Sequence, residues 1–349
     1  MRIVVLGANG QVGAEVCEIL ARAPDIDLVP VSRTRNGSAY LRSRGVAVWH
    51  GDPVKAAQAS AMFAGADLIA NFALAGGVGK VARLANEEII AATLQFSPAK
   101  AKHIFFSTLA VHGVWDEEGG QTGNQYGDLK RSNEAFFAKQ LERNQRAGWT
   151  LRLGHVCGSE QGLSHALRKE IQRGPVFLPD PERASNTIYT QTICDAIIAI
   201  AKGQTSPPGR FDLVNAPQWS WRQVYQYEAG IIGSTVQIES APRQPVTHRR
   251  SIKALAFALI TRLGVRAKLE RALPMLPAQF AEQIRADFMV SRTAGEIAAL
   301  TSSPKIANLA ACWPALETLP LAQLNPTATY SQSPSNSLPG EWATSLETR

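Results

Sequence analysis

The chain has 349 residues, of which 45% are hydrophobic, so it can bury one large core or two modest ones. Its formal charge of +7 comes from 36 Lys and Arg residues against 29 Asp and Glu residues. This excess either suits an anionic ligand such as a phosphate or is ordinary surface charge, and it is too diffuse to predict a nucleic-acid partner.

Targeting and metal-binding signals are missing from the sequence. The stretch MRIVVLG has no signal-peptide pattern, and no apolar run approaches the roughly 18 residues that span a bilayer. The four cysteines are scattered, without metal-ligand spacing. We therefore expect a cytoplasmic protein without disulfides or a metal site.

Short apolar strands alternate with helical patterns over the first half of the chain. Strands are predicted over 2–7, 26–32, 46–52, 67–73, 103–108 and 149–156. Helices are predicted over 11–22, 79–95 and 126–147. This alternation predicts an α/β fold of the Rossmann type, with a doubly wound parallel sheet.

The pattern changes after residue 158. We expect a strand entering a helix over 186–203 and a late strand over 209–215, and further helices over 219–231, 251–263 and 277–300. The predicted division is a dinucleotide-binding domain over 1–158 with 186–215 returning to it, a smaller and mostly helical substrate lobe over 159–185 and 216–324, and a disordered Ser/Thr/Pro-rich tail over 325–349.

A glycine-rich turn joins the first strand to the first helix. Gly7, Gly10 and Gly13 follow a G-x-x-G-x-x-G spacing in the stretch GANGQVG. Such a turn lets a pyrophosphate approach the backbone at a helix N-terminus. We expect a dinucleotide to contact this turn through Gly7, Asn9, Gly10, Gln11, Val12 and Gly13.

The end of the second strand bears on the choice of dinucleotide. An NAD-binding protein carries an acid there, whereas this chain has Ser32, Arg33 and Arg35 in the stretch VSRTR. Guanidinium groups attract a 2′-phosphate, so NADP is preferred and NAD remains an alternative. In the other interpretation these arginines are solvated loop charges. Asp52 and Ala73, after later strands, are further expected cofactor contacts.

Three residues form a candidate catalytic set. Thr108 ends a buried strand at the carboxyl edge, where ligands of such folds bind. Tyr126 and Lys130 are four apart, so they share one face of a helix. An ammonium beside a phenol lowers the pKa of the phenol and makes it a usable proton donor. Ser107 is the alternative hydroxyl.

The order of glycine turn, strand-end hydroxyl and Tyr-x-x-x-Lys resembles the short-chain dehydrogenase/reductase superfamily. Over about residues 1–215 the chain resembles its extended branch, the NAD-dependent epimerase/dehydratase family. The resemblance implies a Thr108–Tyr126–Lys130 triad, in which Tyr126 transfers the proton, Lys130 holds the nicotinamide ribose and Thr108 orients the substrate oxygen. It also implies that family members are often homodimers.

Some positions depart from this family. The segment LRLGHVCG resembles the family's Arg-x-x-Asn-Val-Tyr-Gly at Arg152, but His155 replaces the asparagine near the substrate. Gln191 and Thr192 replace two acids that nucleotide-sugar enzymes carry. His155 and Arg152 are therefore candidate substrate residues, and His155 is equally interpreted as a histidine packed under the sheet edge.

The segment 249–277 combines apolar residues with flanking arginines and lysines. It is interpreted as a lid over a lipophilic or aromatic substrate, as an interfacial helix on an anionic membrane, or as a core helix with a solvated basic face. The last interpretation is slightly favoured.

Together these features predict an NADP(H)-dependent oxidoreductase that reduces a carbonyl or oxidises a secondary alcohol of a small molecule. The alternative is a nucleotide-sugar epimerase or dehydratase that retains NAD(P). An alternative from another class is a non-catalytic dinucleotide-binding regulator.

Overall fold

A computed structural model describes residues 1–33, 35–75, 79–112, 114–115, 121–122, 125–178, 180–205 and 207–240. The helices predicted over 251–263 and 277–300, the basic and apolar segment 249–277 and the predicted tail over 325–349 lie outside the described residues. Within the described part, no helix is long and apolar enough to cross a membrane.

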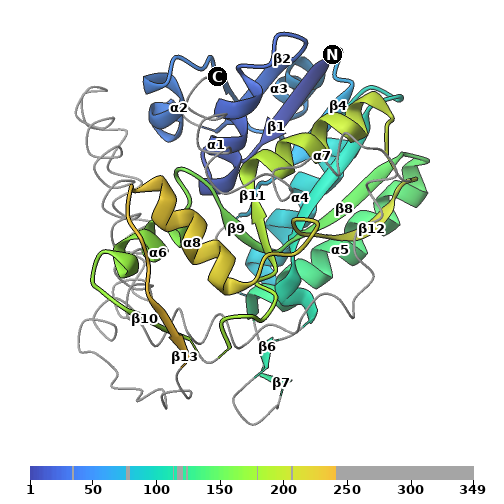
Figure 1. Ribbon diagram of the computed structural model, residues 1–349. Helices are drawn as coiled ribbons and strands as arrows, with labels where there is room; N and C mark the ends of the chain where they lie inside the picture. Colours follow the sequence, from blue (N-terminus) through green and yellow to red (C-terminus); the bar gives the residue numbers. More distant parts are fainter. Residues whose placement is uncertain are drawn as a thin grey trace, which may run out of the picture.

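A seven-stranded sheet forms the centre of the molecule (Figure 1). All neighbouring strands in it are parallel. Their order across the sheet is β12 (Gly209–Leu213), β8 (Gly148–Leu153), β5 (Lys102–Thr108), β4 (Leu68–Asn71), β1 (Arg2–Leu6), β2 (Asp27–Ser32) and β3 (Trp49–His50). The prediction of a doubly wound parallel sheet is confirmed.

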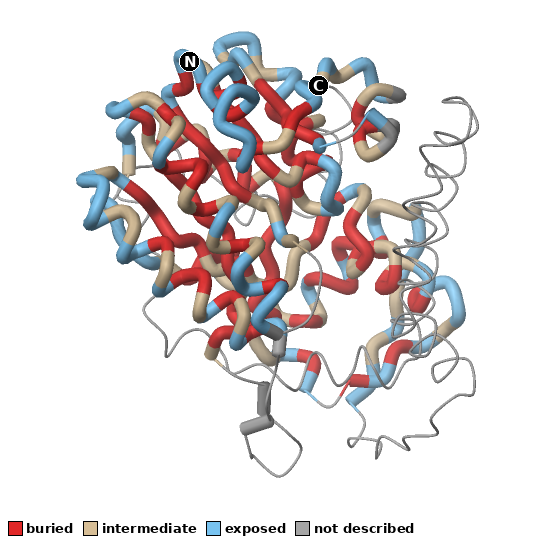
Figure 2. Tube along the Cα trace, turned by 180° about the vertical axis from the view of Figure 1, so that it is seen from behind, coloured by how far each residue is buried: buried red, intermediate tan, exposed pale blue. Residues whose placement is uncertain are grey.

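Helices cover both faces of the sheet, which is why the strands are nearly continuous apolar runs. One face packs against α1 (Gln11–Leu20), α7 (Thr190–Lys202) and the short α2 (Ala39–Ser43). The other face packs against α3 (Ala56–Phe63), α4 (Gly79–Phe96) and α5 (Gln125–Asn144). Figure 2 shows the strands as the buried centre between these two layers.

A second hydrophobic cluster lies beside this three-layer core. It is built around α6 (Gly162–Ile171) and α8 (Trp221–Ile231), with the parallel pair β10 (Val176–Leu178) and β13 (Ile238–Ser240). The α8 helix begins with a capping box between Ser220 and Gln223. The division of the chain into a dinucleotide domain and a substrate lobe stays a prediction.

The remaining elements are short. The 3-10 helices are η1 (Asn36–Ser38) and η2 (Leu109–His112), and an antiparallel pair joins β6 (Val114–Trp115) to β7 (Gln121–Thr122). A further parallel pair is formed by β9 (His155–Cys157) and β11 (Thr187–Tyr189).

Two predicted strands differ from the structure. The strand predicted over 46–52 is limited to β3, the edge of the sheet. The strand predicted over 149–156 is broken at Gly154, where the chain leaves β12 and pairs with β11. At Gly154 the chain passes very close to the backbone of Asn186, and a Cβ there would lie 2.0 Å from the Asn186 carbonyl oxygen. Glycine is therefore the residue that permits this change of partner strand.

Replacing Gly154 with alanine should therefore destabilise the protein by about 3 kcal/mol, the upper end of the usual cost of overpacking. Gly230→Ala is the matched control, because a Cβ there has nothing within 4 Å and lies in α8. It should stabilise the protein by up to about 1 kcal/mol. Urea unfolding measures both changes, and equal effects at the two glycines would contradict the crowding argument.

Candidate functional site

The glycine turn fits a dinucleotide pyrophosphate. Gly7 has a φ of +76°, and a Cβ there would lie 2.7 Å from the backbone nitrogen of Ala73. A Cβ on Gly13 would lie 2.4 Å from the carbonyl oxygen of Gly7. Among the described residues no side chain caps α1 at Gly10, so the N–H groups of its first turn remain available to an anion.

Other residues of the turn are placed differently. Asn9 is exposed and Val12 is half-buried. The Gln11 amide donates to the carbonyl oxygen of Glu160 at 3.3 Å, so this side chain reaches across to the connection that leads into α6. Ala73 contributes its backbone, which is held by the Asn71 side chain at 2.9 Å.

The loop after β2 carries exposed arginines on a fixed backbone. Ser32 is buried at the end of the strand, whereas Arg33 and Arg35 are exposed. The Ser38 hydroxyl donates to the carbonyl oxygen of Arg35 at 2.7 Å and lies 2.8 Å from His50 Nε2.

Two more residues near this loop bear on cofactor binding. Arg42, which the sequence analysis missed, donates to the Ser38 hydroxyl at 3.2 Å and so adds a third cation to this edge. Asp52 accepts from the backbone N–H of Val54 at 3.2 Å and is half-buried.

The adjacent hydroxyls Ser107 and Thr108 point to opposite faces of β5. Thr108 is half-buried, and its Oγ1 accepts from the backbone N–H of Ala110 at 3.2 Å where η2 begins. Ser107 is buried on the α5 side, and its hydroxyl has no hydrogen-bond partner among the described residues. The structure therefore separates the two candidates for one role.

Lys130 is a buried residue of α5, and its side chain points to the sheet. Its side chain is 4% exposed, and its ammonium donates to the carbonyl oxygen of Phe106 at 2.8 Å, two residues before Thr108. The ammonium also lies 5.0 Å from the ring centroid of Phe105. Burial lowers the pKa of Lys130 to about 8, although the charge of Glu134 acts in the opposite direction.

Tyr126 lies one turn earlier on α5 and is 44% exposed. Its surroundings desolvate the hydroxyl and raise the pKa of Tyr126 above its usual value. The expectation that Lys130 lowers the pKa of Tyr126 is therefore wrong in this structure. The reason is that the ammonium of Lys130 is directed to Phe106 on the strand below.

Arg152 lies in a network of ion pairs. Its guanidinium donates to Glu134 of α5 at 2.8 and 3.0 Å, and it lies 3.6 Å from Asp212 of β12. Asp212 in turn lies 3.1 Å from His112 Nε2. The sequence analysis did not identify Glu134 or Asp212, although the position of Glu134, one turn after Lys130, was a usable signal.

His155 lies in β9, at the junction with the second hydrophobic cluster. Its ring centroid is 5.7 Å from that of Trp221. Burial lowers the pKa of His155 to about 4, so its ring is neutral near pH 7. Nearby, Gln191 donates to Asp195 at 3.1 Å and Thr192 donates to Asn215 at 2.9 Å.

A buried carboxylate joins α1 to the connection between β9 and α6. Glu15 accepts from the backbone N–H of Ser159 at 2.7 Å, from Gln161 Nε2 at 2.6 Å and from the Thr190 hydroxyl at 2.9 Å. Burial raises the pKa of Glu15 despite these bonds. The helix that bears the glycine turn is thus fixed to the start of the second cluster.

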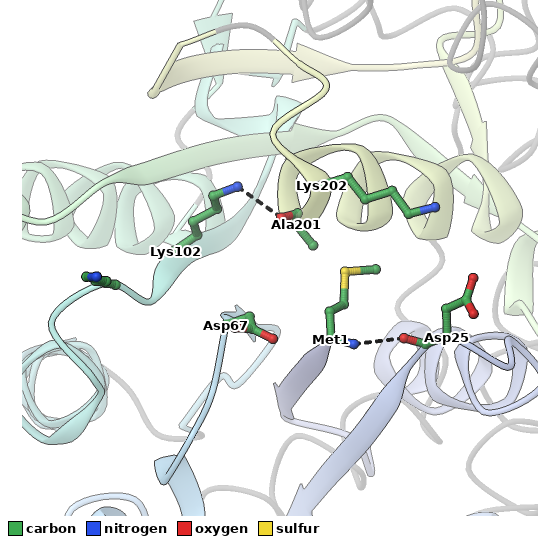
Figure 3. Close-up of a pocket in the computed structure, with 7 residues that line it drawn as sticks. Met1, Asp25, Asp67, Lys102, Ala201 and Lys202 are labelled. Carbon is green, nitrogen blue, oxygen red and sulfur yellow. Dashed lines mark hydrogen bonds between the residues drawn. The ribbon is translucent and has the colours of Figure 1, made fainter.

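A charged hollow lies at the opposite, amino edge of the sheet (Figure 3). Lys102 spans it and donates to the carbonyl oxygens of Ile200 and Ala201 at 2.8 and 2.9 Å, at the end of α7. The strand ends that carry the candidate site lie at the other edge, so this hollow is not part of the site. Within the described residues no group of His, Cys, Asp or Glu side chains could hold a metal ion.

Solved structures of sugar-nucleotide enzymes are similar to this fold. UDP-glucuronic acid 4-epimerase from Bacillus cereus, in complex with UDP-glucuronic acid and NAD, has a TM-score of 0.51 at 17% identity, covering 69% of this chain and 86% of that one. UDP-glucose 4-epimerase from Thermotoga maritima, with UDP-glucose, has a TM-score of 0.51 at 16% identity, covering 71% and 88%. UDP-N-acetylglucosamine 4-epimerase from Bacillus cereus has a TM-score of 0.52 at 13% identity, covering 70% and 88%.

At these identities the similarity supports the fold alone. No curated protein matches the chain. Residues 3–175 match the model of the NAD dependent epimerase/dehydratase family, which covers the glycine turn, Thr108, Tyr126 and Lys130. The predictions of this family and of an NAD(P)-dependent enzyme are confirmed by this match. Through these residues the chain belongs to the NAD dependent epimerase/dehydratase family.

Proposed function

We propose that the protein is an epimerase or dehydratase that keeps its NAD(P) and acts on a sugar nucleotide through an internal cycle of oxidation and reduction. The observation that carries this proposal is the family match over the residues that form the glycine turn and the candidate triad. The bound dinucleotide would supply a hydride acceptor and donor at its nicotinamide ring.

The chain's own residues have separate roles in this proposal. The first turn of α1 binds the pyrophosphate through its backbone N–H groups. Tyr126 takes the proton from the substrate hydroxyl when the carbon is oxidised and returns it when the carbon is reduced. Thr108 orients the reacting oxygen, and the ammonium of Lys130 would contact the nicotinamide ribose.

The position of Lys130 supports this arrangement. Its bond to Phe106 fixes the start of α5 against the end of the strand that carries Thr108. Tyr126, one turn earlier, is thereby kept at the same edge as the glycine turn. A high pKa suits Tyr126 as the proton donor in the return step, because the phenol is then protonated near pH 7.

A second candidate function is reduction of a small-molecule carbonyl by free NADPH. Arg33, Arg35 and Arg42 favour it, because they gather positive charge where a 2′-phosphate would lie. Gln191 and Thr192, in place of the acids of nucleotide-sugar enzymes, favour it as well. The main prediction from sequence was this reductase, and the family match supports the epimerase or dehydratase better.

The first test identifies the retained cofactor and the reaction. The purified protein is denatured, and the released dinucleotide is identified by mass spectrometry. The native protein is then incubated with UDP-glucose, UDP-glucuronic acid or UDP-N-acetylglucosamine, and products are analysed by NMR. We expect bound NAD or NADP and a new sugar nucleotide without net change in absorbance at 340 nm. Stoichiometric loss of added NADPH would instead indicate the reductase.

Tyr126→Phe should lower turnover by about 10²–10⁴-fold, the usual contribution of a general acid–base group, with cofactor content unchanged. Tyr40→Phe is the matched control, since Tyr40 bonds to Glu18 away from Thr108. Near-normal turnover in Tyr126→Phe would refute the role of this hydroxyl.

Arg33→Ala should weaken NADPH binding by about 1.5–3 kcal/mol and NADH binding little, because only NADPH carries the 2′-phosphate. Calorimetric titration of protein stripped of its cofactor measures both affinities. Equal losses for the two dinucleotides would identify Arg33 as a general surface charge.

Lys130→Met should change how stability depends on pH. The folded pKa of Lys130, about 8, lies below its usual 10.5, so only the unfolded chain binds this proton between these values. The stability of the native protein relative to Lys130→Met should rise by about 3 kcal/mol from pH 8 to pH 10.5. Urea unfolding across this range measures it, with the exposed Lys139→Met as control. A constant difference would contradict the buried state of Lys130.

A further inference from the structure

A buried polar layer separates the first half of α5 from the sheet. Ser107, Arg152 and Asp212 lie in register on β5, β8 and β12, so their side chains share the face that α5 covers. From α5, one turn supplies Lys130, Asn133 and Glu134, all buried. The layer therefore consists of Ser107, Lys130, Asn133, Glu134, Arg152 and Asp212.

Glu134 is the carboxylate of this layer that stands nearest to Lys130 along the helix. It is 1% exposed and follows Lys130 by four residues, so the two side chains are neighbours on one helix face. Charges buried at this depth are screened far less than surface charges. The carboxylate of Glu134 therefore favours the protonated form of Lys130.

Arg152 opposes this effect by sharing the same carboxylate. It donates to both oxygens of Glu134 and also lies near Asp212. Arg210, at 3.4 Å, is a second and more exposed cation on Glu134. The effect of the Glu134 carboxylate on Lys130 therefore depends on how far Arg152 neutralises the charge of Glu134.

We propose that Glu134 is a positioning residue that keeps Lys130 charged, and that Arg152 limits this action by pairing with Glu134. This inference rests on the proposed role of Lys130 in the site. It gives Glu134 and Arg152 opposite effects on one ionisation, although the loss of either would weaken the same ion pair.

The other groups around Lys130 are placed as follows. The strand β5 contributes the Phe106 carbonyl and the Phe105 ring, both of which stabilise the ammonium. Beyond Arg152 lie Asp212 and His112, whose Nε2 is 3.1 Å from the Asp212 carboxylate. Burial lowers the pKa of Lys130 to about 8, so a change in a neighbouring charge alters the protonated fraction of Lys130 near neutral pH.

The test measures the ionisation of Lys130 directly. Protein with ¹³C at lysine Cε is titrated by NMR without any substrate, and the Lys130 signal is assigned from its loss in Lys130→Arg. Glu134→Gln should lower the pKa of Lys130 by about one unit. Arg152→Met should raise it by a similar amount, since Arg210 remains to keep Glu134 ionised. Glu142→Gln, at an exposed position of α5, should leave it unchanged.

The proposal would be overturned if Glu134→Gln and Arg152→Met shifted the pKa of Lys130 in the same direction, or if Glu134→Gln left this pKa unchanged. If Glu134→Gln does not fold, the same change is made in Arg152→Met, where it should lower the pKa of Lys130 relative to that background. Cofactor affinity separates this inference from the proposed function. If the pKa shifts occur while Lys130→Met binds NADH normally, the polar layer acts as described and the role of Lys130 in the site is wrong.

Discussion

The site depends on the close parallel approach of β1 and β4 at the carboxyl edge of the sheet. There the turn at Gly7 meets the backbone of Ala73 so closely that a side chain would overlap it. This contact fixes where α1 starts, and hence where its N–H groups point. Because β5 is the next strand along, the same edge also receives Thr108 and the start of α5. One backbone contact thus positions the dinucleotide turn relative to the catalytic candidates.

The α5 helix is held to the sheet in two different ways along its length. Its later half packs conventionally, with Phe137 against Phe105 at 5.5 Å between ring centroids. Its earlier half instead packs against charged and polar side chains of the sheet. Buried ion pairs often contribute little net stability, because the cost of desolvation offsets their attraction. The ion pair of Glu134 and Arg152 is therefore weak evidence for stability, and the proposed role for it is its effect on the ionisation of Lys130.

The sequence was sufficient for the features that depend on local pattern. Apolar runs predicted the strands, and glycine spacing predicted the turn at Gly7. What it could not predict depends on contacts between distant segments. The break at Gly154 arises from the carbonyl of Asn186, and the partners of Arg152 come from α5 and β12. The direction of Lys130 is likewise set by a strand 24 residues earlier, which helical spacing does not reveal.

The bonds of Glu15 have a consequence for how the chain folds. Their partners lie 144 to 175 residues further along the sequence, whereas β1 and β2 pair within a short stretch. Contacts at such separation form late, because the long loop between them must close first. During synthesis from the N-terminus, the residues of the helix that carries the glycine turn are all made long before Ser159, Gln161 and Thr190 emerge. The position of α1 against the second cluster is therefore fixed only afterwards, when these partners have been made.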